Sequence, residues 1–258
     1  LFRSRLRMRD AWRLSVGTLT AVPVAAPAHV DGRTAGRAML LAPLAVVPLG
    51  VMVGLIGWLG VRTGLPLPVV ALLAVGALAA GSRALHWDGL SDVVDGLTAS
   101  YDAERSLAVM KCGTSGPAGV VAVVVVLGLQ VAALASLLDT TRGAVLAGFL
   151  VCASRTVLTI TCLTGVPAAR PSGLGLPHSG TVARPAALAV WVLVMAVTAG
   201  LVAWVGLDWW HGPVAVLLAG LVVALLVRRT VRRFGGVTGD VYGAAIELGL
   251  ATLLVALS

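Results

Sequence analysis

Long apolar stretches without any charged side chain alternate with short polar segments along the whole chain. Residues 38–61, 112–138 and 185–207 contain no Asp, Glu, Lys or Arg. A helix needs about 20 apolar residues to cross the roughly 30 Å hydrocarbon layer of a membrane. Such a helix satisfies its backbone hydrogen bonds internally. A membrane β-barrel would instead show short segments in which apolar and polar residues alternate. The pattern therefore predicts an all-α, polytopic integral membrane protein.

Seven membrane spans account for the apolar stretches. Small residues are frequent within them, which favours close packing of helices in lipid. The sequence shows no soluble domain, repeat or linker, so we expect one membrane-embedded domain over residues 1–258. The predicted spans are 38–60, 64–82, 117–137, 144–164, 186–206, 212–227 and 241–257.

The basic residues are concentrated in alternate loops. The net charge of +8 would by itself suggest a nucleic-acid partner, but seven arginines precede the first span and the next loop holds Arg62 alone. Positive residues favour the cytoplasmic side of a membrane. The distribution therefore indicates topology rather than nucleic-acid binding. It predicts a cytoplasmic N-terminus, an outside C-terminus and cytoplasmic loops at 83–116, 165–185 and 228–240.

The first 28 residues combine basic and apolar positions and allow two interpretations. A secretory signal peptide has this general composition. Gly17, Pro23 and Pro27 interrupt the apolar run, however. We therefore favour a basic amphipathic segment on the membrane surface, with its arginines directed to anionic headgroups.

The segment "HWDGLSDVVDG", residues 86–96, concentrates negative charge in an apolar chain. Asp88, Asp92 and Asp95 are spaced i, i+4, i+7, which places them on one face of a helix, with His86 just ahead. Like charges at this spacing repel, and a hard cation such as Mg²⁺ removes the repulsion. The spacing predicts an Mg²⁺ site that also holds phosphates. The alternative is a solvated loop whose acids contact water or nearby arginines.

Three further polar features support a phosphate site. The turn "MKCGTSGPAG" at 110–119 offers backbone N–H groups and Lys111, and Asp240 precedes the last span. Arg155 lies within a span, which makes it a functional-site hypothesis, with a structural Arg155–Glu247 pair as the alternative. A metal, basic residues and backbone donors together favour phosphoryl transfer, which depends on positioning and charge neutralisation.

The motifs resemble those of the cobalamin synthase family (adenosylcobinamide-GDP ribazoletransferase). That family has a His-x-Asp-Gly-Leu-Ala-Asp-x-x-Asp-Gly block, followed by Glu-x-x-Leu-x-x-Met-Lys before a Gly-rich loop. The matching segments here are "LHWDGLSDVVDGL" and "ERSLAVMKCGTSGPAGV", with support from "SVGTLTAVPV", "SRTVLTITCLTGVPAARPSGLG" and "GGVTGDVYGAAIEL". The resemblance covers most of the chain, in the same order.

The resemblance implies a Mg²⁺-dependent enzyme of the bacterial inner membrane, with a single membrane-embedded catalytic domain over residues 1–258. Such an enzyme joins adenosylcobinamide-GDP to α-ribazole, or to its 5′-phosphate, and releases GMP. Its catalytic positions correspond to His86, Asp88, Asp92, Asp95 and Lys111, and its substrate-binding positions to Glu104, Arg155, Arg170 and Asp240. On this basis we expect the three aspartates of the block to bind Mg²⁺. Lys111 and Arg170 would hold phosphates, and His86 would act as a base or hydrogen-bond donor.

Two departures from the family pattern concern the same region. Trp87 occupies a position where an acid is common in the family, and the loop 112–115 lacks the aspartate that family members carry there. If that aspartate were essential, the protein would be impaired or would use a substitute.

Two other functions remain as alternatives. A CDP-alcohol phosphotransferase also uses aspartates on membrane helices, but Asp92 and Val93 stand where its pattern needs Ala and Arg. A divalent cation transporter would place its acids near the bilayer midplane, whereas these acids are predicted in a cytoplasmic loop. Besides the substrates and the lipid bilayer, a homo-oligomer and other cobalamin-assembly enzymes are left open as partners.

Overall fold

The computed structural model describes residues 2–173 and 175–258, with side chains described from Arg7 onward. Its regular secondary structure consists of helices joined by connecting segments. No β-strand occurs within these residues, which confirms the predicted all-α class. The helices are α1 (Phe2–Leu19), α2 (Gly32–Ala45), α3 (Val47–Thr63), α4 (Leu67–Gly81), α5 (Leu85–Ala99), α6 (Ala103–Val109), α7 (Pro117–Leu137), α8 (Thr141–Ser154), the 3₁₀ turn η1 (Arg155–Val157), α9 (Leu158–Thr161), α10 (Gly175–His178), α11 (Arg184–Val205), α12 (His211–Phe234) and α13 (Gly239–Leu257).

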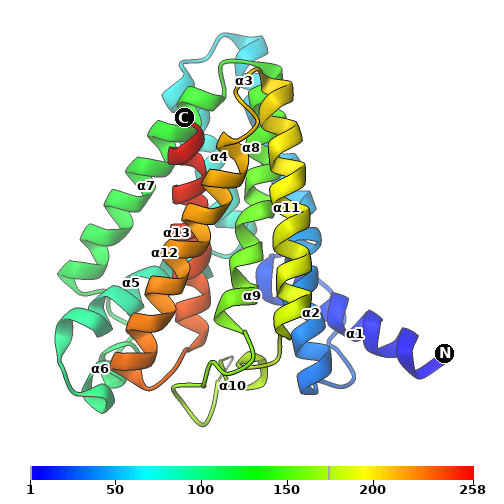
Figure 1. Ribbon diagram of the computed structural model, residues 1–258. Helices are drawn as coiled ribbons and strands as arrows, with labels where there is room; N and C mark the ends of the chain where they lie inside the picture. The colour runs from blue at the N-terminus through cyan, green and yellow to red at the C-terminus, as the bar shows by residue number, and fades with distance from the viewer. Residues whose placement is uncertain (1, 174) are drawn as a thin grey trace.

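The predicted multi-pass helical architecture is confirmed, with candidate spans at six of the seven predicted positions. In the described residues, six helical segments are long and apolar enough to cross a membrane, with α2 and α3 forming one of them and α8 to α9 another. A seventh span results if α4 is counted together with α5, from which it is bent by 89°. The two termini lie at opposite ends of the bundle, as an odd number of crossings requires (Figure 1). The helices α1, α5, α6 and α10 gather at the N-terminal end, so the long polar segments share one side (Figure 1).

A sharp elbow directs the aspartate-bearing helix across the end of the bundle. Arg83 and Ala84 adopt left-handed backbone conformations, with φ of 57° and 53°. Such conformations cost about 1–2 kcal/mol each for residues other than glycine. Arg83 offsets part of this cost because its guanidinium donates a 2.8 Å hydrogen bond to the carbonyl of Gly17 in α1. As a result, α4 carries the apolar part of the bent pair, and α5 belongs to none of the six segments that could each cross a membrane.

Two glycines allow α5 to lie directly against α13. A Cβ atom at Gly89 would come within 2.6 Å of the Asp240 carbonyl oxygen. A Cβ atom at Gly243 would lie 2.9 Å from the Cα of His86. Neither neighbour can yield easily, because both are backbone atoms. This close approach brings the first turn of α13 beside the acidic block of α5.

Substitution of Gly89 tests this packing. We expect Gly89→Ala to lose about 1–3 kcal/mol of stability relative to Gly76→Ala, because its methyl group would overlap the α13 backbone. Gly76 is the matched control, since it lies in helix α4 and its added Cβ would meet nothing within 4 Å. Thermal unfolding in detergent measures the difference. Equal midpoints for the two variants would contradict the proposed helix contact.

Candidate active site

A cavity of about 310 Å³ opens at the polar end of the bundle. Its walls come from the first turns of α5 and α13, the segment that includes α10, and the end of α1. Polar and apolar side chains both line it, among them His86, Asp88, Arg170, Thr238, Asp240 and Tyr242. Two motifs that are far apart in the sequence therefore meet at one site.

Short β-type pairing joins the segment after α9 to the turn before α13. The Ala169 N–H donates to the Val237 carbonyl at 2.9 Å, and the Val237 N–H donates to the Pro167 carbonyl at 3.0 Å. Gly236 is required here because a Cβ atom would lie 2.5 Å from the Pro167 carbonyl oxygen. This pairing carries Arg170 to the rim of the cavity.

Arg170 is held in place by contacts to two elements. Its Nη1 lies 3.8 Å from the Oδ2 of Asp240, and its Nη2 donates a 2.8 Å hydrogen bond to the Leu107 carbonyl in α6. Thr238 donates a further hydrogen bond to Asp240 Oδ2 at 3.0 Å. Arg170 is the one Lys or Arg among the described residues that line this cavity. It is therefore the best-placed group to bind a phosphate there.

The carboxylates around the cavity form a region of negative charge. Asp88 is exposed and lines the cavity, while Asp92 is half-buried one turn further along α5. Burial, and then the negative charges of Asp88 and Asp240, raise the pKa of Asp92 to about 6. Since these neighbours destabilise the ionised form, a bound cation would relieve the repulsion.

The arrangement fits a metal ion that is completed by its substrate. Among the described residues, no three His, Cys, Asp or Glu side chains stand close enough together to form a metal centre. Mg²⁺ commonly uses one or two carboxylates together with water and phosphate oxygens. The carboxylates of Asp88 and Asp92 suit that role by their chemistry and position. The assignment of Mg²⁺ to these aspartates stays a prediction.

Asp95 has a different environment from the other two aspartates of the block. Its buried carboxylate accepts hydrogen bonds from the N–H groups of Gly116 at 2.7 Å and Gly119 at 2.8 Å, at the N-terminus of α7. Added Cβ atoms at these glycines would approach the carboxylate oxygens to 2.6 and 2.4 Å. We expected this Gly-rich turn to present its N–H groups to a phosphate, and for these two groups that was wrong. Asp95 has a structural role, while its role as a metal ligand stays a prediction.

The structure does not place the second family motif at the cavity. Glu104 is exposed in the first turn of α6, and Lys111 is exposed in the turn that follows this helix. Neither side chain lines the cavity. Their predicted contacts with substrate stay predictions, as does any effect of the altered loop at 112–115, which is also exposed.

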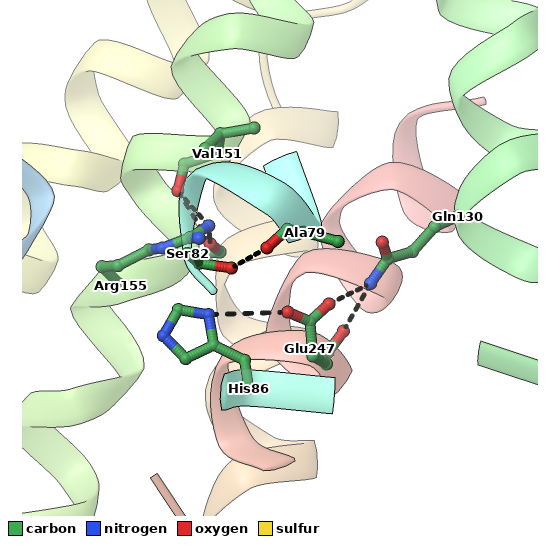
Figure 2. Close-up of polar contacts among 8 residues, drawn as sticks. Ala79, Ser82, His86, Gln130, Val151, Arg155 and Glu247 are labelled. Carbon is green, nitrogen blue, oxygen red and sulfur yellow. Dashed lines mark hydrogen bonds and ion pairs between the residues drawn. The ribbon is translucent and has the colours of Figure 1, made fainter. Parts of the chain in front are cut away.

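A buried polar cluster, drawn in Figure 2, adjoins the cavity through His86, which lines it. His86 Nδ1 lies 3.6 Å from Glu247 Oε1, and Gln130 donates a 2.8 Å hydrogen bond to Glu247 Oε2. Arg155 is fully buried and donates to the Val151 carbonyl at 2.9 Å. No Arg155–Glu247 ion pair forms within the described residues, so the structural pair considered from the sequence is replaced by His86–Glu247. Arg155 does not line the cavity, and its substrate role stays a prediction.

The sequence analysis missed two residues that shape the site. The Tyr242 hydroxyl donates a 3.1 Å hydrogen bond to the Gly175 carbonyl, which ties α10 to α13. Gln130 anchors Glu247 from α7. Gln130 had a detectable signal, because it is the only glutamine in the chain and lies within an apolar span. The only signal for Tyr242 in the sequence was its position two residues after Asp240.

The family comparison agrees with the motifs. The chain matches the CobS family, described as cobalamin-5-phosphate synthase, over residues 11–258. The chain belongs to this family. Membership confirms the predicted resemblance, the enzyme class and the assignment to cobalamin biosynthesis.

Several relatives are similar over nearly their whole length. A Nocardioides protein named adenosylcobinamide-GDP ribazoletransferase is 59% identical over 96% of this chain and 98% of its own. Proteins of the same name from Frankia casuarinae and Pseudomonas aeruginosa are 39% and 38% identical, with 94% and 100% of their own lengths covered. No solved structure matches the chain.

The contrasting environments of Asp92 and Asp95 give a testable difference. We expect Asp95→Asn to lose about 1–3 kcal/mol of stability, because it removes charge and one acceptor from the N-terminus of α7. Asp92→Asn should unfold at or above the wild-type temperature, since it removes repulsion. Thermal unfolding of both variants in detergent measures this. If Asp95→Asn is as stable as Asp92→Asn, the capping role assigned to Asp95 is wrong.

Proposed function

We propose that this protein is an adenosylcobinamide-GDP ribazoletransferase, the activity for which its relatives are named. It would join adenosylcobinamide-GDP to α-ribazole, or to α-ribazole 5′-phosphate, with release of GMP. The observation that carries the proposal is the cavity at which Asp88, Asp240 and Arg170 meet. Carboxylates that suit a metal, beside an arginine fixed at the rim, form a site for a diphosphate.

In the proposed reaction, the ribazole hydroxyl oxygen bonds to the phosphorus attached to the cobinamide arm. The bond between that phosphorus and the bridging oxygen then breaks, and GMP leaves. Arg170 is already oriented by Asp240 and Leu107, so it would stabilise phosphate charge without further rearrangement. A Mg²⁺ bound through Asp88 and Asp92 would neutralise charge on the diphosphate.

The apolar part of the cavity wall would protect the reaction from water. Leu19, Met39 and Ile246 line the cavity together with the polar groups. Excluding water limits hydrolysis of the activated diphosphate and strengthens the electrostatic contacts. A volume of about 310 Å³ is at the low end for small-molecule sites, so the corrin ring would remain at the mouth.

The position of the acids disfavours the cation-transporter alternative. Transporter sites generally lie near the bilayer midplane. Here α5 lies at the end of the bundle, after the 89° bend from α4. We further propose that this end faces the cytoplasm of a bacterial inner membrane, because the arginine-rich N-terminal segment lies on the same side.

Charge removal at the cavity tests the activity. Membranes containing the protein, supplied with adenosylcobinamide-GDP, α-ribazole and Mg²⁺, should form the joined product, detected by chromatography. Asp88→Asn and Asp92→Asn should each lower turnover on the order of 10³-fold or more, because the diphosphate loses its charge neutralisation. The control is Asp139→Asn, which removes an exposed aspartate from the loop between α7 and α8. Normal turnover in both cavity variants would contradict the proposed site.

Cysteine labelling tests the orientation. In a background without Cys112, Cys152 and Cys162, we expect Tyr101→Cys to resist an impermeant thiol reagent in intact cells and Trp209→Cys to react. Both positions suit labelling, because the native side chains are 91% and 64% exposed. Permeabilised cells, in which both should react, provide the control. The reverse pattern in intact cells would place the site on the outside.

A further inference from the structure

The polar cluster that adjoins the cavity is assembled from three helices that meet in the apolar interior. His86 comes from α5, Gln130 from α7 and Glu247 from α13. Their exposed fractions are 5%, 0% and 1%. Burial of such groups is costly unless each is oriented by a partner. Packing alone therefore does not explain why these polar groups are buried together. His86 also lines the cavity, which connects the cluster to the candidate active site.

Glu247 is held in a single orientation. Gln130 Nε2 lies 2.8 Å from Glu247 Oε2 and 3.2 Å from the Glu247 backbone carbonyl oxygen, so one amide group contacts both the side chain and the helix that carries it. Arg155, which is fully buried nearby, interacts electrostatically with Glu247. The remaining carboxylate oxygen, Oε1, faces the imidazole of His86 (Figure 2).

This geometry favours one position for the hydrogen of the His86 imidazole. Nδ1 lies 3.6 Å from Glu247 Oε1, and a carboxylate in that position favours a hydrogen on Nδ1. Contacts of this kind are often long in unliganded sites and shorten when substrate binds. Both ring nitrogens are buried and make no hydrogen bond within the described residues, and Nε2 lies on the side of the ring away from Glu247 (Figure 2). A hydrogen on Nδ1 therefore leaves Nε2 with a lone pair, at a residue that lines the cavity.

We propose that Glu247, anchored by Gln130, is a positioning residue for His86. It holds the imidazole in the tautomer whose Nε2 accepts a hydrogen bond from the attacking hydroxyl group of the acceptor substrate. Carboxylate–histidine pairs orient hydroxyl nucleophiles in this way on unrelated folds. The inference rests on the proposed function for the identity of the hydroxyl, but the tautomer itself does not depend on it.

The Glu247→Gln variant distinguishes a positioning role of Glu247 for His86 from a purely structural role in helix packing. Glutamine has the same shape, and its amide group would offer N–H to Nδ1, which favours the opposite tautomer. We expect the variant to fold and to lose kcat on the order of 10²–10³-fold, with KM within about twofold of wild type. The matched control is Thr230→Val, which removes a fully buried hydroxyl that contacts only its own helix α12. It should retain kcat.

Nitrogen NMR of the four histidines, labelled with ¹⁵N, reads the tautomer directly. His86→Gln assigns the signal. Wild-type His86 should show a protonated Nδ1 and an unprotonated Nε2, and Glu247→Gln should invert this pattern. An unchanged pattern in the variant, or the Nε2–H tautomer in the wild type, would overturn the proposal even if the enzyme is active.

A double variant supplies the rescue test. Glu247→Gln combined with Gln130→Glu reverses the hydrogen bond between α7 and α13, because the amide at position 247 then donates to the carboxylate at position 130. This orientation turns the amide oxygen at position 247 toward His86 Nδ1, which again favours a hydrogen on Nδ1. We expect the wild-type tautomer and part of kcat to return. If the unfolding temperature matches wild type while the tautomer returns and kcat stays as low as in Glu247→Gln, the tautomer does not control turnover and the proposal would fail. If the wild type forms no product while NMR shows the expected tautomer, the proposed function fails and the positioning role of Glu247 stands.

Discussion

Direct backbone contact between α5 and α13 is the constraint on which the site depends. Gly89 and Gly243 remove the side chains that would separate these helices. The acidic block consequently lies beside Asp240, and His86 lies beside Glu247. One helix contact thus supplies both the charged mouth of the cavity and the polar cluster that adjoins it. The glycine of the Asp-Gly pair in the motif belongs to this contact, whereas its aspartate lines the cavity.

The same need for close approach explains why polar groups are tolerated in such an apolar chain. Asp95 is buried, but glycines at 116 and 119 let the N–H groups of α7 reach its carboxylate. Glu247 is buried, but the amide of Gln130 reaches it from α7. In each case the partner comes from another helix. The polar residues therefore join helices at positions where lipid and water are both absent.

The cavity lies where a connecting segment meets the first turns of α5 and α13. Arg170 reaches it from a segment that is paired with the turn before α13 through Ala169 and Val237. Contacts to Asp240 and to the Leu107 carbonyl then hold the guanidinium of Arg170 in place. Phosphoryl transfer relies on such fixed charge more than on covalent participation, so a small rigid site at a helix end suits the chemistry of the family.

The sequence by itself determined the features that depend on local pattern. Apolar runs located the spans because the hydrocarbon thickness sets helix length, and the helical period placed Asp88 and Asp92 near one another. Motif order identified the family. Only the tertiary structure decided which partner each polar group has: Asp95 meets α7, Glu247 meets His86 rather than Arg155, and Lys111 stays outside the cavity. These outcomes depend on contacts between residues far apart in the chain, and periodicity within one helix carries no information about the helix that packs against it.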